Sequence, residues 1–259
     1  MIYAPMLGKP IVELDKFVDV DALLNLEKYV ALAIAKNKNY ISVAFSGPVN
    51  PALKTWLNEK EYLEVKTSWV NVDREMPEEL NNRWVSLTHD QQLWYTLLTT
   101  KSRSLNYSLT VRAIANSSGG NGGKFHLKHL AAETVDTQIR KDFECIFDWV
   151  NSQNIFDEIG RVQFFINPEG NCTPIHRDYA DRTHNDQYLW IRFNKQKDFF
   201  VYDTDSDKKF FVNGYVCTFD NHQWHGGEPG ECMGFSLRID GLFSKSFLEK
   251  TGLDKHFTN

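Results

Sequence analysis

The sequence predicts an α+β protein in which an antiparallel β-barrel is flanked by N-terminal helices. Up to about residue 150, apolar residues recur at three- and four-residue steps in several segments, as in amphipathic helices. From Gly160 onwards the pattern changes to short apolar runs separated by turn residues, which is typical of strands. The aromatic content of 14% is high and favours sheets and a ligand pocket. Strands this short should close into a barrel or pack as two sheets, because none can cover a core alone.

Helices dominate the expected structure of the first part of the chain. The three expected helices span about residues 19–38, 50–63 and 136–150. Asp19 or Asp21 can cap the first of them, because a carboxylate at a helix start accepts backbone hydrogen bonds. Pro51 opens the second, since proline suits the first helical turn. Short strands are expected between the helices, at Tyr40–Phe45, Glu64–Val70 and Ser108–Ile114.

Six short strands are expected in the second part of the chain. They are Val162–Ile166, Tyr188–Phe193, Phe199–Tyr202, Lys209–Val212, Tyr215–Phe219 and Gly234–Ile239. Turn residues such as Asn213-Gly214 separate them. We therefore expect a single domain over residues 1–259. Residues 1–159 would form a mainly helical flanking and substrate-covering region, 160–243 the metal-binding barrel core, and 244–259 a C-terminal helix or tail.

Charge and composition indicate which classes of partner and which cellular compartment to expect. The 29 Lys+Arg and 34 Asp+Glu residues give a net charge of −5, so no attraction to nucleic acid or to an anionic membrane is expected. No apolar run approaches the roughly 18 residues of a membrane span, and no secretory signal pattern stands at the start. The four cysteines form no CxxC pair. We expect a cytoplasmic protein with reduced thiols that acts on a small molecule or a protein.

Two His-x-Asp tripeptides offer ligands for a metal ion. Iron(II) is well served by two imidazoles and one carboxylate, and residues two apart on a strand project to the same side. His176-Arg177-Asp178 follows a strand, a turn and a further extended stretch, which favours His176 and Asp178 as the ligand pair. His184-Asn185-Asp186 lies in a polar run typical of a loop and stays open as the alternative.

A third ligand should come from a strand further along the chain, where two histidines are available. His225 ends a short strand and precedes the turn at Gly226-Gly227, so its imidazole can point inwards at a barrel mouth. His222 lies nearer the turn at Asn221, and we expect it at the surface or behind the ligands. The favoured metal ligands are therefore His176, Asp178 and His225.

A cation and neighbouring polar side chains can form a site for an anionic co-substrate. Arg238 lies in an apolar strand after His225, and the planar guanidinium of arginine matches a carboxylate with two hydrogen bonds. Tyr188 and Arg192 alternate with Trp190 on one face of a strand and are further candidates. Gln163, on the preceding strand, is a comparable candidate.

The order of His176, Asp178, His225 and Arg238 resembles the iron(II) and 2-oxoglutarate-dependent oxygenase superfamily. The match covers about Val162 to Asp240 and looks most like the aspartyl/asparaginyl β-hydroxylases and small proline hydroxylases. The resemblance implies a double-stranded β-helix, the jelly-roll or cupin-like barrel. It also implies that His176, Asp178 and His225 hold catalytic Fe(II), that Arg238 binds the far carboxylate of 2-oxoglutarate, and that O2 is the second co-substrate.

The expected reaction is hydroxylation of an unactivated C–H bond. The substrate would be a small polar molecule such as an amino acid, or a protein side chain. Two alternatives stay open. A cupin-like metal-binding protein would use no 2-oxoglutarate, and Arg238 would then face solvent. A non-catalytic binding module would use the histidines only as structural residues.

Overall fold

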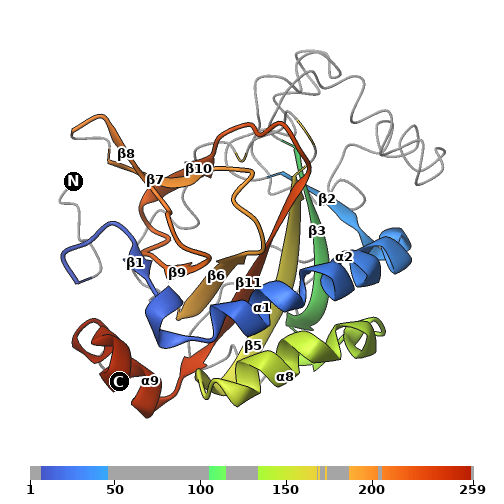
Figure 1. Cartoon of the computed structure of the whole chain (residues 1–259), viewed down its shortest axis with the longest axis horizontal. Coiled ribbons are helices and arrows are strands. Elements are labelled where there is room, and N and C mark those ends of the chain that lie inside the picture. Colours follow the sequence, from blue (N-terminus) through green and yellow to red (C-terminus); the bar gives the residue numbers. More distant parts are fainter. Residues whose placement is uncertain are drawn as a thin grey trace.

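Two antiparallel sheets and a layer of helices make up the computed structural model (Figure 1). The structure describes residues 7–45, 105–114, 134–167, 169, 173, 187–203 and 206–257. The expected helix 50–63 and the expected strand 64–70 lie outside these residues.

The larger sheet is antiparallel throughout and runs in the order β1-β9-β6-β11-β5-β3-β2, with β4 paired to β3. Its strands are β1 (Val12–Glu13), β2 (Ser42–Phe45), β3 (Leu105–Ile114), β4 (Thr134–Asp136), β5 (Phe156–Asn167), β6 (Tyr188–Arg192), β9 (Val216–Thr218) and β11 (Gly234–Phe243). The smaller sheet has the order β10-β7-β8 and contains β7 (Phe199–Asp203), β8 (Lys208–Phe211) and β10 (Trp224–Gly227).

Helices cover one face of the larger sheet (Figure 1). They are α1 (Val20–Asn25), α2 (Glu27–Lys36), α8 (Glu144–Ser152) and α9 (Lys245–Thr251), with the short 3-10 helices η1 (Asp15–Phe17), η2 (Lys38–Tyr40), η4 (Arg140–Phe143) and η5 (Leu253–Lys255). Between this layer and the sheet lies the main apolar core, which includes Phe164 of β5, Leu237 of β11 and Phe147 of α8. Each buried phenylalanine or leucine contributes about 1.5–3 kcal/mol relative to an exposed side chain.

Because side chains alternate along each strand, the face of the larger sheet opposite the helices carries a separate set of side chains, which face the functional pocket. Along β5, Val162 and Phe164 enter the helix-side core, so Gln163 and Phe165 point to the other face. Gln163 pairs with Arg238 of β11 across the strands, and Arg238 in turn pairs with Trp190 of β6. One continuous row of side chains therefore crosses the sheet and faces the smaller sheet.

The expected mixture of helices and antiparallel strands is confirmed, but several expected boundaries are wrong. The expected helix 19–38 is two helices, α1 and α2, which meet at Leu26; Asp19 caps α1 by accepting a hydrogen bond from Ala22 N at 2.9 Å. The expected helix 136–150 begins only at Glu144, because residues 134–136 pair with β3 and a 3-10 turn follows. Strand pairing with β3 outweighs helix propensity there.

Two of the longest strands extend well beyond the expected apolar runs. β5 begins at Phe156 and not at Val162, and β11 continues to Phe243. The two strands pair with each other, with an irregular register near Gly241. This pairing extends both strands over polar residues that the apolar pattern alone excluded from them. β2 and β3 join the same sheet, so residues before Gly160 supply strands as well as helices.

Candidate active site

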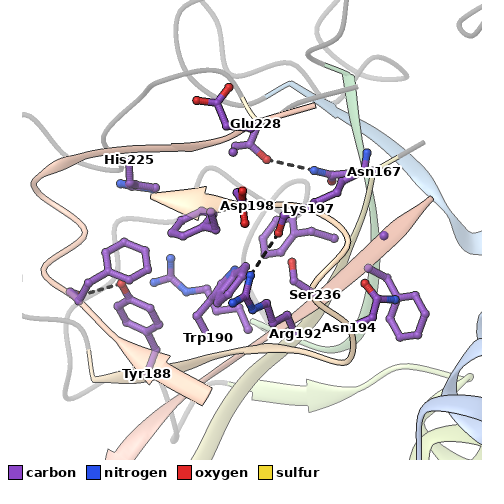
Figure 2. A pocket seen from close by; sticks show the side chains of 18 residues that line it. Asn167, Tyr188, Trp190, Arg192, Asn194, Lys197, Asp198, His225, Glu228 and Ser236 are labelled. Carbon is purple, nitrogen blue, oxygen red and sulfur yellow. Dashed lines mark hydrogen bonds between the residues drawn. The ribbon is translucent and has the colours of Figure 1, made fainter. Parts of the chain in front are cut away.

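A pocket lies between the two sheets, on the face of the larger sheet that the helices do not cover (Figure 2). It encloses about 830 Å³ of empty space, counting its open mouth. Much of its wall is aromatic and comes from Phe165, Trp190, Phe199, Phe219 and Phe235. A few polar side chains, among them those of His225 and Arg238, also face the pocket. An apolar wall with a few polar groups is typical of a small-molecule site.

His225 is the one predicted metal ligand that the described part of the chain contains. Its side chain lies in the pocket wall, and the residue is 5% exposed. Its Nδ1 atom lies 2.8 Å from the carbonyl oxygen of Gln223. Because a carbonyl oxygen only accepts, Nδ1 must donate this hydrogen bond. This arrangement leaves Nε2 as the nitrogen that could bind a metal ion, and the backbone contact also fixes the orientation of the ring.

The strand that carries His225 differs from the expectation. We expected a strand to end at His225, whereas His225 is the second residue of β10, pairs with Val201 of β7 and precedes two further strand residues. The glycines of the Gly226-Gly227 pair continue the strand and do not turn it. The imidazole ring packs beside Phe219 and Phe199, with centroid distances of 5.0 and 5.9 Å. A buried strand therefore orients this imidazole more firmly than a turn would.

The side chain of His222 is 8% exposed. Of the two positions expected for this residue, at the surface or behind the ligands, the surface position is therefore wrong. Its Nδ1 atom lies 2.8 Å from the Oδ1 atom of Asp220, and the Asp220 carboxylate also accepts the backbone N–H of His222. His222 does not belong to the pocket wall. These contacts give it a role in holding the loop before β10.

The other two predicted ligands, His176 and Asp178, lie outside the described residues, as do the alternatives His184 and Asp186. Thr173, three residues before His176, is described and lies at the pocket. Its carbonyl oxygen accepts a hydrogen bond from Gly227 N at 2.9 Å, and its Oγ1 accepts one from Asn167 Nδ2 at 3.2 Å (Figure 2). The chain at Thr173 therefore runs directly beside β10. Within the described part of the chain, no three His, Cys, Asp or Glu side chains are grouped closely enough to hold a metal ion.

Arg238 enters the pocket from β11 as a buried and firmly oriented cation. The residue is 9% exposed, and its Nε donates to Asp240 Oδ1 at 2.7 Å. The second oxygen of Asp240, a residue that is 1% exposed, accepts from Arg161 Nε at 2.8 Å. The guanidinium of Arg238 also lies over the ring of Tyr188, 4.2 Å from its centroid. A ring face and a carboxylate thus hold Arg238, and it does not face solvent.

Tyr188 and Arg192 lie at the pocket as expected, but their polar groups form bonds within the protein. The hydroxyl of Tyr188 donates to the carbonyl of Phe219 at 2.7 Å, so this residue offers its ring, as a support for Arg238. Arg192 donates to the carbonyls of Gly214 and Val212 at 2.7 Å each, and to that of Lys197 at 3.3 Å. These three contacts make Arg192 a structural link between the β8–β9 turn and the pocket wall.

Gln163 lies beneath the pocket and is 1% exposed. It stands across from Arg238 in β11 and from Thr110 in β3. Throughout the structure as described, neither its Nε2 nor its Oε1 has a hydrogen-bond partner. A buried amide left unsatisfied costs about 1–3 kcal/mol, so such a group usually has a function or a bound water. Gln163 is therefore the described residue whose polar atoms most need a ligand.

Charged side chains of both signs surround the mouth of the pocket. Lys197 passes against Gly230 and Gly234, where an added methyl group would lie within 2.6 and 3.3 Å of its side-chain carbons. Asp198 and Glu228 provide carboxylates (Figure 2), and Glu228 is paired with Lys209. This rim matches a ligand that carries both charges better than one that carries a single charge.

The sequence analysis missed Asp240 and Arg161 as members of the site. Asp240 stands two residues after Arg238, so strand alternation alone puts both on one face and would have indicated it. Arg161 lies before the strand that we expected to begin at Val162. It was missed because the apolar run hides the true start of β5 at Phe156.

Burial raises the pKa of the Cys217 thiol well above its ordinary value, and the nearby carboxylate of Glu13 raises it further. Cys217 lies in β9 across from Trp190. A thiol that stays protonated is a poor nucleophile, so Cys217 acts as a small buried apolar residue. Cys232, by contrast, is exposed.

Solved structures that resemble this chain include oxygenases and cupins. A prolyl-4-hydroxylase from Pseudomonas putida is 11% identical, with a TM-score of 0.42 over 92% of this chain and 95% of that one. A 2OG-Fe(II) oxygenase family protein from Burkholderia pseudomallei is 12% identical, with a TM-score of 0.35 over 52% of this chain and 65% of that one. A cupin domain from Bordetella pertussis is 14% identical, with a TM-score of 0.25 over 35% and 86%. No protein-family model and no curated protein sequence matches this chain. Likeness this distant assigns no function, which has to be argued from the site itself.

None of the helices in the described ranges is both long enough and apolar enough to span a membrane.

Proposed function

We propose that this protein is an Fe(II)- and 2-oxoglutarate-dependent dioxygenase that hydroxylates a C–H bond of a small polar substrate, such as an amino acid, or of a protein side chain. The observation that carries the proposal is the joint presence of His225 and Arg238 in one aromatic pocket. The imidazole is oriented with Nε2 as the nitrogen that could bind a metal ion, and the guanidinium is buried and held in place. We take the two facing sheets as a double-stranded β-helix of the jelly-roll type, and the chain as a member of the oxygenase superfamily, in the branch that the sequence resembles.

His225, together with the predicted ligands His176 and Asp178, would hold the metal. When bound, Fe(II) supplies the oxidation in which substrate, 2-oxoglutarate and O2 give hydroxylated substrate, succinate and CO2. The protein contributes the orientation of His225 through Gln223. It also contributes a wall of aromatic rings, which keeps bulk water away from the reacting atoms.

Arg238 would bind the far carboxylate of 2-oxoglutarate. Since its Nε is bonded to Asp240, a carboxylate that takes two hydrogen bonds must use the edge formed by Nη1 and Nη2. Gln163 lies beside this position with an unsatisfied amide and is the second group we assign to the co-substrate. The ring of Tyr188 packs against the guanidinium of Arg238, and the hydrogen bonds of Arg192 stabilise the pocket wall.

An amino acid suits the mouth of the pocket because its two charges match the rim. Lys197 complements a carboxylate, while Asp198 complements an ammonium group. No nucleic-acid partner is proposed, because the net charge of −5 offers no electrostatic attraction. A cupin-like metal-binding protein without 2-oxoglutarate chemistry is the alternative, but the burial of Arg238 in the pocket speaks against it.

Succinate formation tests the proposal. The protein is incubated with Fe(II), 2-oxoglutarate, ascorbate, O2 and a panel of amino acids, and succinate and product mass are measured. We expect succinate in every reaction that contains a productive substrate, and a product that has gained one oxygen atom. Iron-loaded, folded protein that forms no succinate with or without substrate would support the alternative.

A further inference from the structure

A stack of two aromatic rings connects the two sheets along one wall of the pocket. The ring of Trp190, in β6 of the larger sheet, stacks on that of Phe199, in β7 of the smaller sheet. The ring centroids are 4.5 Å apart, and the planes make an angle of 26°. Each residue is 8% exposed, and both line the pocket. Because the two rings come from different sheets, the stack spans the gap between them.

The two rings lie next to the residues that we assign to the anion and to the metal. Trp190 pairs with Arg238 of β11, so the two side chains are neighbours on the pocket face of the larger sheet. Phe199 pairs with Gly227, two residues after His225 in β10, and its ring centroid is 5.9 Å from that of the imidazole. A ligand that reaches from Arg238 to a metal ion on His225 therefore crosses the gap that the stack spans.

Packing around the stack holds both rings in place. Cys217 of β9 lies across from Trp190, and the ring of Phe219 packs against that of Phe199 with a centroid distance of 5.3 Å. All four side chains belong to one buried apolar cluster. Protein interiors are packed as closely as organic crystals, so neither ring can move aside without displacing its neighbours. The stack therefore sets the separation of the two sheets at this wall.

We infer that the stack of Trp190 and Phe199 determines the length of the 2-oxo dicarboxylate that the pocket accepts. The inference rests on the proposed function, because it concerns a co-substrate bound by Arg238 at one end and by the metal at the other. A rigid aromatic wall leaves no space for a longer carbon chain to bend between these two ends. In a pocket with apolar walls, one added methylene group changes the affinity by about 10- to 200-fold.

The test compares 2-oxoglutarate with 2-oxoadipate, which is one methylene group longer, by anaerobic calorimetry in the presence of Fe(II). We expect the wild type to bind 2-oxoglutarate at least about tenfold more tightly. Phe199→Leu keeps the wall apolar but leaves a space that its neighbours fill only partly. It should bind 2-oxoadipate more tightly than the wild type does, and the ratio of the two dissociation constants should change about tenfold. Trp190→Phe shortens the stack from the other sheet and should act in the same direction, which provides a second variant if Phe199→Leu does not fold.

Phe200→Leu is the matched control, because it is the same substitution at the next residue of β7. Phe200 is 1% exposed, but neighbouring residues of a strand point to opposite faces, and it does not belong to the pocket wall. Its ring packs against that of Phe211, with a centroid distance of 5.8 Å. We expect a lower melting temperature and an unchanged ratio of the two dissociation constants.

Three results would overturn the inference: equal affinity of the wild type for both acids, a wild-type ratio in both Phe199→Leu and Trp190→Phe, or an equal change of the ratio in Phe200→Leu. Failure of the proposed function looks different. In that case the folded wild type binds neither 2-oxo acid in the presence of Fe(II), and the inference fails with it.

Discussion

Arg238 is the residue on which the binding of an anion depends most directly. It is buried, it points into a pocket with aromatic walls, and a carboxylate and a tyrosine ring limit its motion. Little of its side-chain entropy remains to be lost when a ligand binds, so more of the interaction energy appears as affinity.

Arg238→Met should weaken 2-oxoglutarate binding by about 30- to 5,000-fold while iron binding is kept. Loss of one member of a buried charge-assisted pair costs about 2–5 kcal/mol, which corresponds to that range. Calorimetry with Fe(II)-loaded protein measures it. Arg192→Met is the control: Arg192 bonds three backbone carbonyls, so its loss should lower the melting temperature and change the dissociation constant far less. The reverse ranking of the two variants would make Arg192 the anchor.

The sequence predicted several residues of the site better than it predicted their roles. His225, Arg238, Tyr188 and Arg192 all line the pocket, because alternation along a strand determines the face on which a side chain lies. Alternation does not show what a polar atom bonds to. Arg192 was assigned to a ligand, but its bonds reach carbonyls about twenty residues further along the chain, in a turn whose position depends on the tertiary fold.

At the scale of elements, the turn between β8 and β9 is held from both sides. Four consecutive backbone N–H groups, from Asn213 to Val216, donate to the carboxylates of Glu13 and Asp15 at 2.8–3.0 Å. On the other side of the turn, carbonyls of the same chain segment accept from Arg192. The N-terminal elements β1 and η1 thereby fix the turn to which Arg192 of the pocket wall is bonded.

Asp15→Asn and Gly214→Ala should each destabilise the protein by about 1–3 kcal/mol. Asp15→Asn weakens charge-assisted hydrogen bonds to two N–H groups, and a methyl group at Gly214 would lie 2.3 Å from Glu13 Oε2. Urea unfolding followed by circular dichroism gives the free energy of unfolding. Asp157→Asn, which alters an exposed carboxylate in β5, should change it by less than about 0.5 kcal/mol. Equal changes in the free energy of unfolding for Asp15→Asn and Asp157→Asn would show that the hydrogen bonds from the turn to Asp15 contribute nothing.

The sequence predicted this turn but not the two carboxylates that hold it. Asn213-Gly214 separates two apolar runs and favours a turn, and the structure has a bend at Gly214 and Tyr215. β8 and β9 lie in different sheets, so the bend connects the two sheets and forms no hairpin. The partners Glu13 and Asp15 are about 200 residues away, and no local pattern connects them to it. The same reason explains why a helix was expected to begin at Asp136, the last residue of β4, since the pairing of β4 with β3 is a long-range contact.

At the scale of the whole molecule, one sheet serves two functions. Helices bury one of its faces in the main core, and the other face carries the polar row that extends from Trp190 through Arg238 to Gln163. The C-terminal segment closes the molecule near the loop before β10, where His256 lies close enough to Asp220 to interact with it electrostatically.

Acid should loosen this C-terminal segment. Burial lowers the pKa of His256 below its ordinary value of 6.5, and Asp220 only partly opposes the shift. Between the folded and unfolded pKa values, the unfolded chain binds more protons, so the free energy of unfolding rises with pH across that window. The stabilisation is complete above about pH 6.5 and is lost as the pH falls through the lower, folded value.

His256→Asn should therefore flatten the dependence of the melting temperature on pH between about pH 5 and 7. Melting curves of wild type and variant at matched ionic strength measure the two slopes. Identical slopes would mean that His256 contributes nothing to the acid sensitivity of the fold.

The most direct test of the proposed site is an anaerobic titration of the protein with Fe(II) and 2-oxoglutarate, followed by visible absorption. Bidentate binding of 2-oxoglutarate to iron gives a weak charge-transfer band. We predict this band for the wild type at one iron per chain, its loss in His225→Ala and in His176→Ala, and its retention in His222→Ala, whose imidazole bonds Asp220 outside the pocket. A folded wild-type protein that shows no band, or a band that survives in His225→Ala, would contradict the assignment of this pocket.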